Sequence, residues 1–437
     1  MGLFAVSLVA AGCSSDDAGG QPARAPTQGQ KLLPRIDAAL AAAARFLVAR
    51  QSEDGAWRSE THECFRDGPE LTPHVLASLF FLPQGGEAVG PAFDRGVAFM
   101  TRLVSKEGKI EPGPRGLSFP VFTAGLASRV AALSRQGAAE RAALAAWVAY
   151  VRERQFAEHN GWGPVHAAYG GWGFSVAVPR LEKPEPGRIA ERFFEANLVA
   201  TVYGVEALRS ARVAPADPAC EKALTFVKRC QNFADHPHQA DPLYDDGGFF
   251  FMLNDTMQNM AGVAGRDRFG KTRFHSYGSM TAAGVRALVA CGLPLDHPRV
   301  AAARRWLEVN WAVDMNPGTF TKDREVLRNS QYYYYVWSLA QALVALETRE
   351  MITAQGGVRW GEALAEELIA RQKRDGAWRN VYSDSKNPDY PGAKEDDPLV
   401  STPFAAGALA ICRAVITGEY ADIGRVGPAA TSTGKEQ

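Results

Sequence analysis

A nine-residue stretch that occurs once near each end of the chain constrains the fold more than any other feature. Residues 50–58 read RQSEDGAWR and residues 371–379 read RQKRDGAWR, so seven of the nine positions agree. Each copy follows a run of apolar residues with helical spacing. The tryptophan, Trp57 or Trp378, is too apolar to expose and suits a wedge between neighbouring helix pairs. A stretch that recurs at both ends of one domain indicates a repeat array.

The glycines of the chain support this interpretation. Gly55 and Gly376 fall where the preceding helix should end, and glycine adopts the left-handed conformation of a helix C-terminus without a Cβ clash. A glycine inside a helix costs about 1 kcal/mol relative to alanine. A second repeat places a glycine inside each of three expected inner helices: Gly204-Val205-Glu206-Ala207-Leu208, Gly284-Val285-Arg286-Ala287-Leu288 and Gly407-Ala408-Leu409-Ala410-Ile411. Close approach of neighbouring backbones in a crowded inner ring would offset the cost of these glycines.

The pattern Gln-x-x-Asp-Gly-x-Trp resembles the QW-type repeat of squalene-hopene and oxidosqualene cyclases, which β subunits of protein prenyltransferases share in looser form. Residues 210–412 also resemble uncharacterised bacterial proteins described as prenyltransferase and squalene oxidase repeat proteins. The resemblance implies an all-α fold, an (α/α)6 toroid of six inner and six outer helices around a central cavity. It says nothing about the reaction.

Six helix pairs can be placed along the sequence. Thr72-Pro73 predicts the start of the first inner helix, because threonine can cap and proline suits the first helical position, and Thr402-Pro403 repeats this pair. Long loops rich in glycine and aromatic residues precede several inner helices and should line the mouth of the cavity. The predicted segments are a signal segment at 1–13, a flexible tether at 14–33, the toroid at 34–424 and a disordered tail at 425–437.

Charge and the N-terminal segment limit the partners. The chain has 48 basic and 48 acidic residues, so no net field favours nucleic acid, and we expect none as a partner. Residues 3–12 are apolar but shorter than the ~20 residues that span a membrane. They lead into Cys13 in a pattern that resembles a bacterial lipobox, which implies a lipidated protein in the cell envelope, facing the periplasm or the exterior. A monomer held only by this N-terminal lipid anchor is the expected state.

The residues supply neither of the family's usual catalytic motifs. Class II cyclases of this family use an Asp-x-Asp-Asp motif to supply the acid, and the most similar stretch of this sequence is Lys394-Glu395-Asp396-Asp397. Mutual repulsion in that cluster could raise the pKa of one carboxyl, so Asp396 and Asp397 are candidate catalytic residues together with Glu195. The alternative is an acidic loop favoured by the dipole of the next helix.

Metal and cofactor binding are not expected. The Asp-x-Cys pair with which protein prenyltransferases bind zinc is absent, and the five cysteines after Cys13 resemble neither a zinc pattern nor a disulfide framework. His236 and His238, with aspartates nearby, could build a metal site, but incidental histidines in a polar loop are the commoner case. We therefore predict no metal ligand and no cofactor.

Residues near the starts of the inner helices are the candidate ligand contacts. The run of four tyrosines at 332–335 covers every direction around a helix, so at least one ring should face the cavity and another the packed side. The alternative for each single residue is ordinary packing. The predicted ligand-binding residues are His74, Trp172, Phe249, His275, Tyr277, Gln331 and Tyr333.

Three functional hypotheses follow. The first is an exported, terpenoid-cyclase-like toroid that binds an isoprenoid or another apolar small molecule in its cavity, with or without transforming it. The second is a non-catalytic binding or scaffold module of the envelope. The third is a glycan-active enzyme with paired carboxylates in an open cleft. If the protein is an enzyme, the resemblance implies a cyclase, isomerase or transferase activity on isoprenoids.

Overall fold

Helices dominate the computed structural model, which describes residues 28–82, 88–134, 137–181, 195–383 and 394–419. Two antiparallel hairpins, β1 Val263–Arg266 with β2 Thr272–Phe274 and β3 Glu350–Thr353 with β4 Gly356–Arg359, add short sheets. The outer helices are α1 Gln28–Val48, α3 Val89–Arg102, α5 Ala138–Glu153, α7 Pro218–Arg229, α9 Pro298–Val309 and α11 Trp360–Arg371. The inner helices are α2 Leu71–Leu79, α4 Pro120–Leu133, α6 Leu198–Ser210, α8 Gly278–Ala290, α10 Tyr332–Ala345 and α12 Pro398–Thr417.

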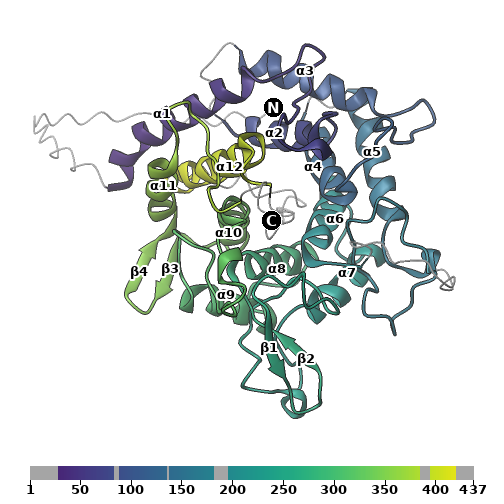
Figure 1. Ribbon diagram of the computed structural model, residues 1–437, viewed down its shortest axis with the longest axis vertical. Coiled ribbons are helices and arrows are strands. Elements are labelled where there is room, and N and C mark those ends of the chain that lie inside the picture. The colour runs from purple at the N-terminus through teal and green to yellow at the C-terminus, as the bar shows by residue number, and fades with distance from the viewer. Residues whose placement is uncertain (1–27, 83–87, 135–136, 182–194, 384–393, 420–437) are drawn as a thin grey trace, which may run out of the picture.

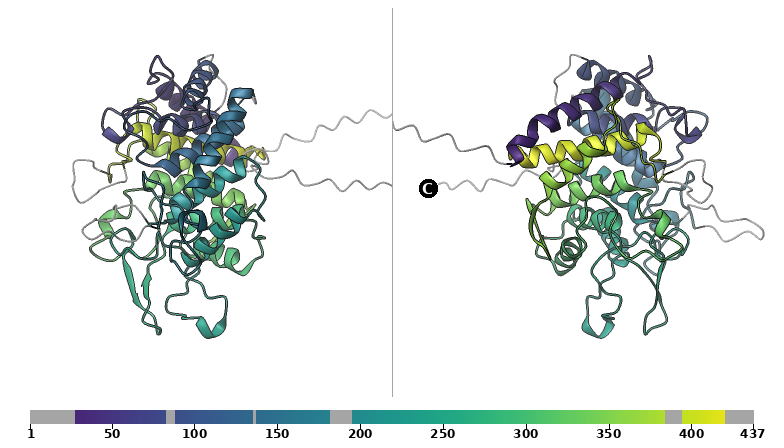
Figure 2. Two further views of the ribbon diagram at one scale, coloured as in Figure 1. Left: turned by 90° about the vertical axis from the view of Figure 1, so that its right-hand side faces the viewer. Right: turned by 60° about the vertical axis from the view of Figure 1, so that its left-hand side comes forward.

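The inner helices form a closed ring (Figure 1). Each packs against the next in the order α2, α4, α6, α8, α10, α12, and α12 returns to α2. The first and last helices of the described chain, α1 and α12, lie side by side at this closure (Figure 2). The predicted all-α toroid of six inner and six outer helices is confirmed.

The boundaries of two helices differ from the prediction. Residues 28–33, predicted as tether, belong to α1, because Leu32 is buried and Gly29 lies against the side chains of Glu362 and Ile416. Thr402 and Pro403 lie inside α12, which begins at Pro398. The Thr-Pro pair therefore does not mark a helix start there.

Each copy of the repeated stretch ties three helices together. The Trp57 indole donates to Leu47 O at 2.7 Å, and its backbone N–H donates to the Thr72 hydroxyl at 3.1 Å. Trp378 repeats both bonds, at 2.8 Å and 3.0 Å, and both tryptophans are fully buried. The threonine thus anchors the wedge instead of capping a helix. The wedge predicted for the tryptophans is confirmed.

Two further copies are present that the sequence conceals. Trp172 Nε1 donates to Val151 O at 2.8 Å and its N–H donates to Thr201 at 3.1 Å. Phe249 takes the tryptophan position, with its N–H donating to Thr281 at 3.1 Å. Insertions hide these copies, since glutamine and glycine are 15 and 16 residues apart here but only 4 apart in the visible copies.

The glutamine of each copy reaches the next outer helix. Its amide donates both to the carbonyl of the repeat glycine and to a backbone carbonyl in the next outer helix. The second bond runs from Gln51 to Ala92 at 2.8 Å, from Gln155 to Ala219 at 2.9 Å, from Gln231 to Arg299 at 2.8 Å and from Gln372 to Ala39 at 2.9 Å. This bond is the link between consecutive outer helices.

The prediction that the repeat glycines end helices is wrong. These glycines instead turn the chain against the next outer helix. α1 ends at Val48 and α11 at Arg371, before Gly55 and Gly376. Both have φ near +90°, and a Cβ on Gly376 would lie 2.5 Å from Ala42 O of α1. Glycine is needed there for its backbone angle and for its missing side chain.

Close backbone approach was the expectation for the three repeat glycines of the inner helices, but Gly204, Gly284 and Gly407 lie against aromatic rings instead. Gly125 of α4 does lie against a neighbouring backbone, 2.7 Å from Tyr203 O for an added Cβ. A Cβ on Gly204 would lie 2.7 Å from the Trp172 ring, and one on Gly284 would lie 2.4 Å from the Phe249 ring. Gly407 meets Trp337 in the same way. The aromatic wedges thus reach the inner ring.

α12 is, among the described residues, the helix long and apolar enough to cross a membrane. Its apolar window is 89% buried inside the ring. That burial is typical of a core helix.

We predict that Gly376→Ala destabilises the fold more than Gly108→Ala. Both glycines have positive φ, so both variants carry the left-handed cost of about 1–2 kcal/mol. Only the first adds the clash with Ala42 O, since nothing lies within 4 Å of a Cβ at Gly108. Urea unfolding should give an extra loss of at least ~1 kcal/mol for Gly376→Ala. Equal losses would contradict the close approach.

Candidate functional site

The lumen enclosed by the six inner helices is crossed by a hydrogen bond. Arg129 of α4 donates from Nη1 to Gln341 Oε1 of α10 at 3.0 Å. α4 and α10 are opposite helices of the ring, so this contact lies in the lumen. Its position defines which side chains face the centre.

Aromatic side chains from four inner helices line the lumen nearer the N-terminal ends of the inner helices. We call His74, Phe122, Tyr334 and Phe404 the throat. The ring of Phe404 lies 4.3 Å from that of His74 and 5.7 Å from that of Tyr334. Phe122 lies 5.9 Å from His74 and is half-buried, as is Phe119 one turn before it on the same helix face. Half-buried apolar rings thus continue the throat toward Phe119.

His74 is a neutral group in this environment. It is buried, and its Nε2–H donates to Val400 O at 2.9 Å. Burial lowers the pKa of His74 to about 4, although the bond to Val400 opposes the shift. At neutral pH it is therefore an uncharged part of an apolar wall.

A charged layer lies deeper in the lumen. We call Arg129, Glu206, Arg286, Trp337 and Gln341 the floor. Arg286 donates to Glu206 Oε1 at 2.6 Å and 3.0 Å. Burial opposes the charge of Arg286, but Glu206 offsets it and raises the pKa of Arg286 above its usual range. The pair is a buried salt bridge between α6 and α8.

The second arginine of the floor has no such partner. No carboxylate of the described residues lies within ion-pair distance of Arg129, which lies over the rings of Phe81 and Trp337 at 5.2 Å and 5.8 Å. Burial lowers the pKa of Arg129, yet arginine stays charged because its reference pKa exceeds 12. The floor thus holds two cations and one anion.

The acidic cluster is dispersed by its contacts. Glu395 accepts backbone N–H bonds from Tyr333 and Tyr334 at 2.9 Å and 2.7 Å and so caps α10. Burial, not mutual repulsion, raises the pKa of Glu395 to about 7. Asp397 caps α12 through Leu399 N–H at 2.7 Å and also contacts Ser59. These two carboxylates therefore cap helix N-termini from buried positions.

Asp396 differs from its two neighbours because it stays partly exposed. Its carboxylate lies 2.9 Å from His62 Nε2. The ring of His62 lies 6.2 Å from Phe65, which lies 5.8 Å from Phe119. These ring contacts connect the Asp396–His62 pair to Phe119, which precedes Phe122 of the throat.

The tyrosine run divides between the lumen and the packed side. Tyr334 faces the lumen, whereas the hydroxyls of Tyr332 and Tyr335 donate to Val313 O and Ala312 O, both at 2.6 Å. Tyr333, the predicted ligand contact, is buried with its ring 5.1 Å from that of Tyr332. Gln331, just before α10, is half-buried and makes no side-chain cap bond.

The other predicted residues lie outside the lumen lining. Trp172 and Phe249 are fully buried wedges and offer no surface to a ligand. Tyr277 is buried 5.7 Å from the Phe320 ring. Glu195 is exposed before α6. His275, whose pKa burial lowers, lines a cavity of about 290 Å³ with Asp246 and Trp306.

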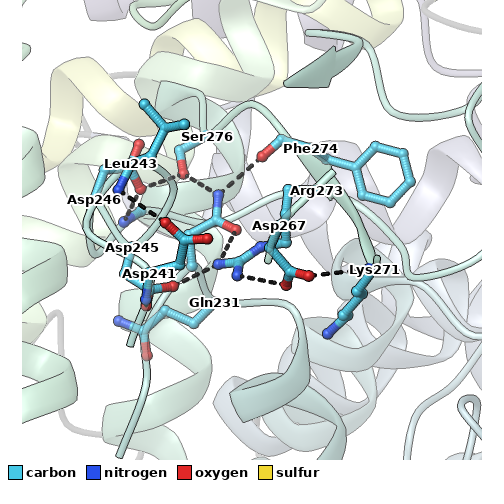
Figure 3. A network of polar contacts seen from close by, with 12 residues as sticks. Gln231, Asp241, Leu243, Asp245, Asp246, Asp267, Lys271, Arg273, Phe274 and Ser276 are labelled. Carbon is cyan, nitrogen blue, oxygen red and sulfur yellow. Dashed lines mark hydrogen bonds and ion pairs between the residues drawn. The ribbon is translucent and has the colours of Figure 1, made fainter. Parts of the chain in front are cut away.

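A larger cleft lies between the end of α7 and the β1–β2 hairpin. Its volume is about 650 Å³, and a network of polar contacts borders it (Figure 3). Arg273 lies between two carboxylates, 2.5 Å from Asp245 and 3.3 Å from Asp267. Both carboxylates thus share one guanidinium.

The histidine pair proposed as a metal alternative is engaged otherwise. The rings of His236 and His238 are exposed and stack at 5.6 Å, while Asp235 pairs with Arg299 at 2.8 Å. The described part of the chain contains no group of three or more His, Cys, Asp or Glu residues placed to hold a metal ion. Cys13 lies outside the described residues.

Comparison with solved structures identifies the same architecture in two enzymes. Cellobiose 2-epimerase from Spirochaeta thermophila is 15% identical with a TM-score of 0.53, over 90% of this chain and 99% of that chain. A variant of the type II terpene cyclase MstE from Scytonema, in complex with geranylgeranyl dihydroxybenzoate, is 16% identical with a TM-score of 0.51, over 88% and 99%. The likeness concerns the fold.

No protein-family model and no curated protein sequence matches the chain.

The sequence did contain a signal for part of the floor. Glu206 and Arg286 occupy the same position of the inner-helix repeat, where the third copy has Leu409. An acid and a base at equivalent positions of otherwise apolar helices indicate an ion pair inside the ring. Nothing comparable marks Arg129 or Gln341.

We predict a pH-dependent contribution of His74 to stability. Its folded pKa of about 4 lies below the unfolded value of 6.5, so the unfolded state takes up the proton first. The contribution is therefore present above pH 6.5 and lost as pH falls toward 4, by about 3 kcal/mol at 1.36 kcal/mol per pKa unit.

The measurement is the difference in unfolding free energy between wild type and His74→Gln, which should shrink over that range. His238→Gln, which removes an exposed histidine, is the matched control. A constant difference for His74→Gln would contradict its buried neutral state.

Proposed function

We propose that the protein binds an isoprenoid or another apolar small molecule in the lumen, along the throat. The observation that carries this proposal is the convergence of aromatic side chains from four inner helices on one axis. The half-buried rings of Phe119 and Phe122 leave apolar surface on which a ligand can pack. Burial of that surface supplies the binding energy.

The electrostatics favour binding over proton-initiated cyclisation. That reaction needs a strong acid facing the ligand. Glu206, the carboxylate of the floor, is paired with Arg286 and does not face the ligand as a free acid. His74 is neutral and already donates its proton to a backbone carbonyl. If the ligand is transformed, the Asp396–His62 pair is the group near the throat that is able to move a proton.

A non-catalytic binding or scaffold module is the second candidate. Tyr334 is 6% exposed, Phe404 5% and Trp337 4%, so the centre of the ring is largely filled by side chains. The glycan-active alternative has less support. A glycosidase needs one protonated carboxyl beside an ionised one, whereas Asp245 and Asp267 share one arginine.

The binding proposal is tested with geranylgeraniol as the probe. Native mass spectrometry and a fluorescence titration should detect one molecule bound to the wild-type protein. Phe122→Ala should weaken binding at least ~10-fold, because a buried aromatic contact contributes about 1.5–3 kcal/mol.

The matched control is Phe269→Ala, because Phe269 is 64% exposed and lines the cleft between α7 and the β1–β2 hairpin, outside the lumen. It should bind the probe as the wild type does. Absence of binding to the wild type, or equal weakening in the two variants, would argue against the lumen as the site.

We further propose that the protein is anchored in the cell envelope through a lipid on Cys13. Cys13→Ser should move the protein from the membrane fraction to the soluble fraction. Cys64→Ser, which changes a half-buried internal thiol, should leave the distribution unchanged. A soluble wild-type protein would exclude the anchor.

A further inference from the structure

Several polar groups around the floor have no hydrogen-bond partner. They are Arg129 Nε, Trp337 Nε1, Gln341 Nε2 and the hydroxyl of Tyr203. All except Gln341, which is half-buried, are at least nine-tenths buried. The Trp337 N–H lowers the pKa of Tyr203, which shows that the two groups are near each other. They do not reach hydrogen-bond geometry.

These unpaired groups are gathered in one place instead of being spread over the molecule. Leaving one buried polar group unpaired costs about 1–3 kcal/mol. Native structures contain only a few such groups per 100 residues. Here three N–H donors come from the two opposite helices α4 and α10, at the place where Arg129 and Gln341 already meet. A partner that accepts hydrogen bonds in the lumen would satisfy them.

The charge of the floor defines what that partner is. Glu206 pairs directly with Arg286 and acts on Arg129 only from beyond ion-pair distance, while Arg129 itself contacts an amide oxygen and two aromatic faces. An uncompensated cation in a buried site is costly, and an anion beside it removes most of that cost. The excess is a single positive charge, which matches a monoanion better than a diphosphate.

On the basis of the function proposed above, we propose that the apolar ligand carries a carboxylate, which binds at the floor to Arg129 with Trp337 and Gln341. Guanidinium and carboxylate form short, charge-assisted hydrogen bonds. The indole and the amide supply further N–H donors to the same oxygen atoms. Arg129 is thus the residue that recognises the head group.

The geometry of α4 sets the orientation of the ligand. Phe122 and Arg129 lie two helical turns apart on the same helix, which is about 10 Å along its axis. The carboxylate therefore lies at the floor while the apolar chain extends along the throat toward Phe119. A ligand of this kind is an isoprenoid or other lipid acid.

The test compares farnesol with farnesoate, which share a chain and differ in the head group. Each is titrated against the full chain at pH 7.5, below its critical micelle concentration. Wild type should bind farnesoate at least ~10-fold more tightly than farnesol, the value of one charge-assisted hydrogen bond of about 1.5 kcal/mol. Arg129→Gln should abolish this preference, so that the variant binds farnesoate no more tightly than farnesol.

Two further variants and a stability measurement serve as controls. Arg359→Gln, at a 68%-exposed arginine of β4, should retain the preference for farnesoate. Thermal melts without ligand establish that Arg129→Gln is folded, and farnesoate should raise the melting temperature of wild type but not of that variant. Arg129→Lys keeps the charge but loses the fork geometry, so it should keep only part of the preference.

The outcomes separate the two proposals. Equal binding of farnesol and farnesoate to wild type overturns the carboxylate site and leaves apolar binding in place. Retention of the preference by Arg129→Gln overturns the role of Arg129. Binding of neither compound overturns the proposed function together with this inference.

Discussion

The structure depends on one hydrogen bond made four times, from the glutamine of each repeat to the backbone of the next outer helix. A backbone carbonyl inside a helix is normally engaged within that helix, so the glutamine amide donates to the second lone pair of the carbonyl oxygen. The repeat glycine lies directly against the same outer helix. A side chain at the glycine would push that helix away and lengthen the bond. Bond and glycine together fix the spacing of consecutive outer helices and therefore the curvature of the ring.

The same repeats determine how wide the lumen is. The aromatic wedges pack on glycines of the inner helices, which lets Trp172 and Phe249 reach deep between the two layers. The inner helices are held close together as a result, and their central side chains meet across the ring. The contact of Arg129 with Gln341 is a consequence of this narrow spacing. A wider ring would leave these groups to water and remove the reason for a buried charge.

Burial gives the acidic residues near the ring closure their structural roles. Glu395 and Asp397 lie at starts of adjacent inner helices, where several backbone N–H groups lack partners within the helix. Carboxylates satisfy these donors and benefit from the helix dipole. The acidic cluster Glu395-Asp396-Asp397 is therefore divided. Two stabilise helix ends, and Asp396, paired with His62, remains accessible near the throat.

The sequence by itself determined the repeat array, the number of helices and the wedge role of Trp57 and Trp378, because local motifs and helical spacing carry that information. It could not identify the lumen. The inner helices are buried on nearly every face, so they have no polar side whose periodicity would distinguish the lumen from the packed side. Only the tertiary structure decided that Tyr334, and not Tyr333, faces the centre, and that Arg129 meets Gln341 from the opposite helix. Ring closure brings together residues more than 200 positions apart, and no local pattern records that contact.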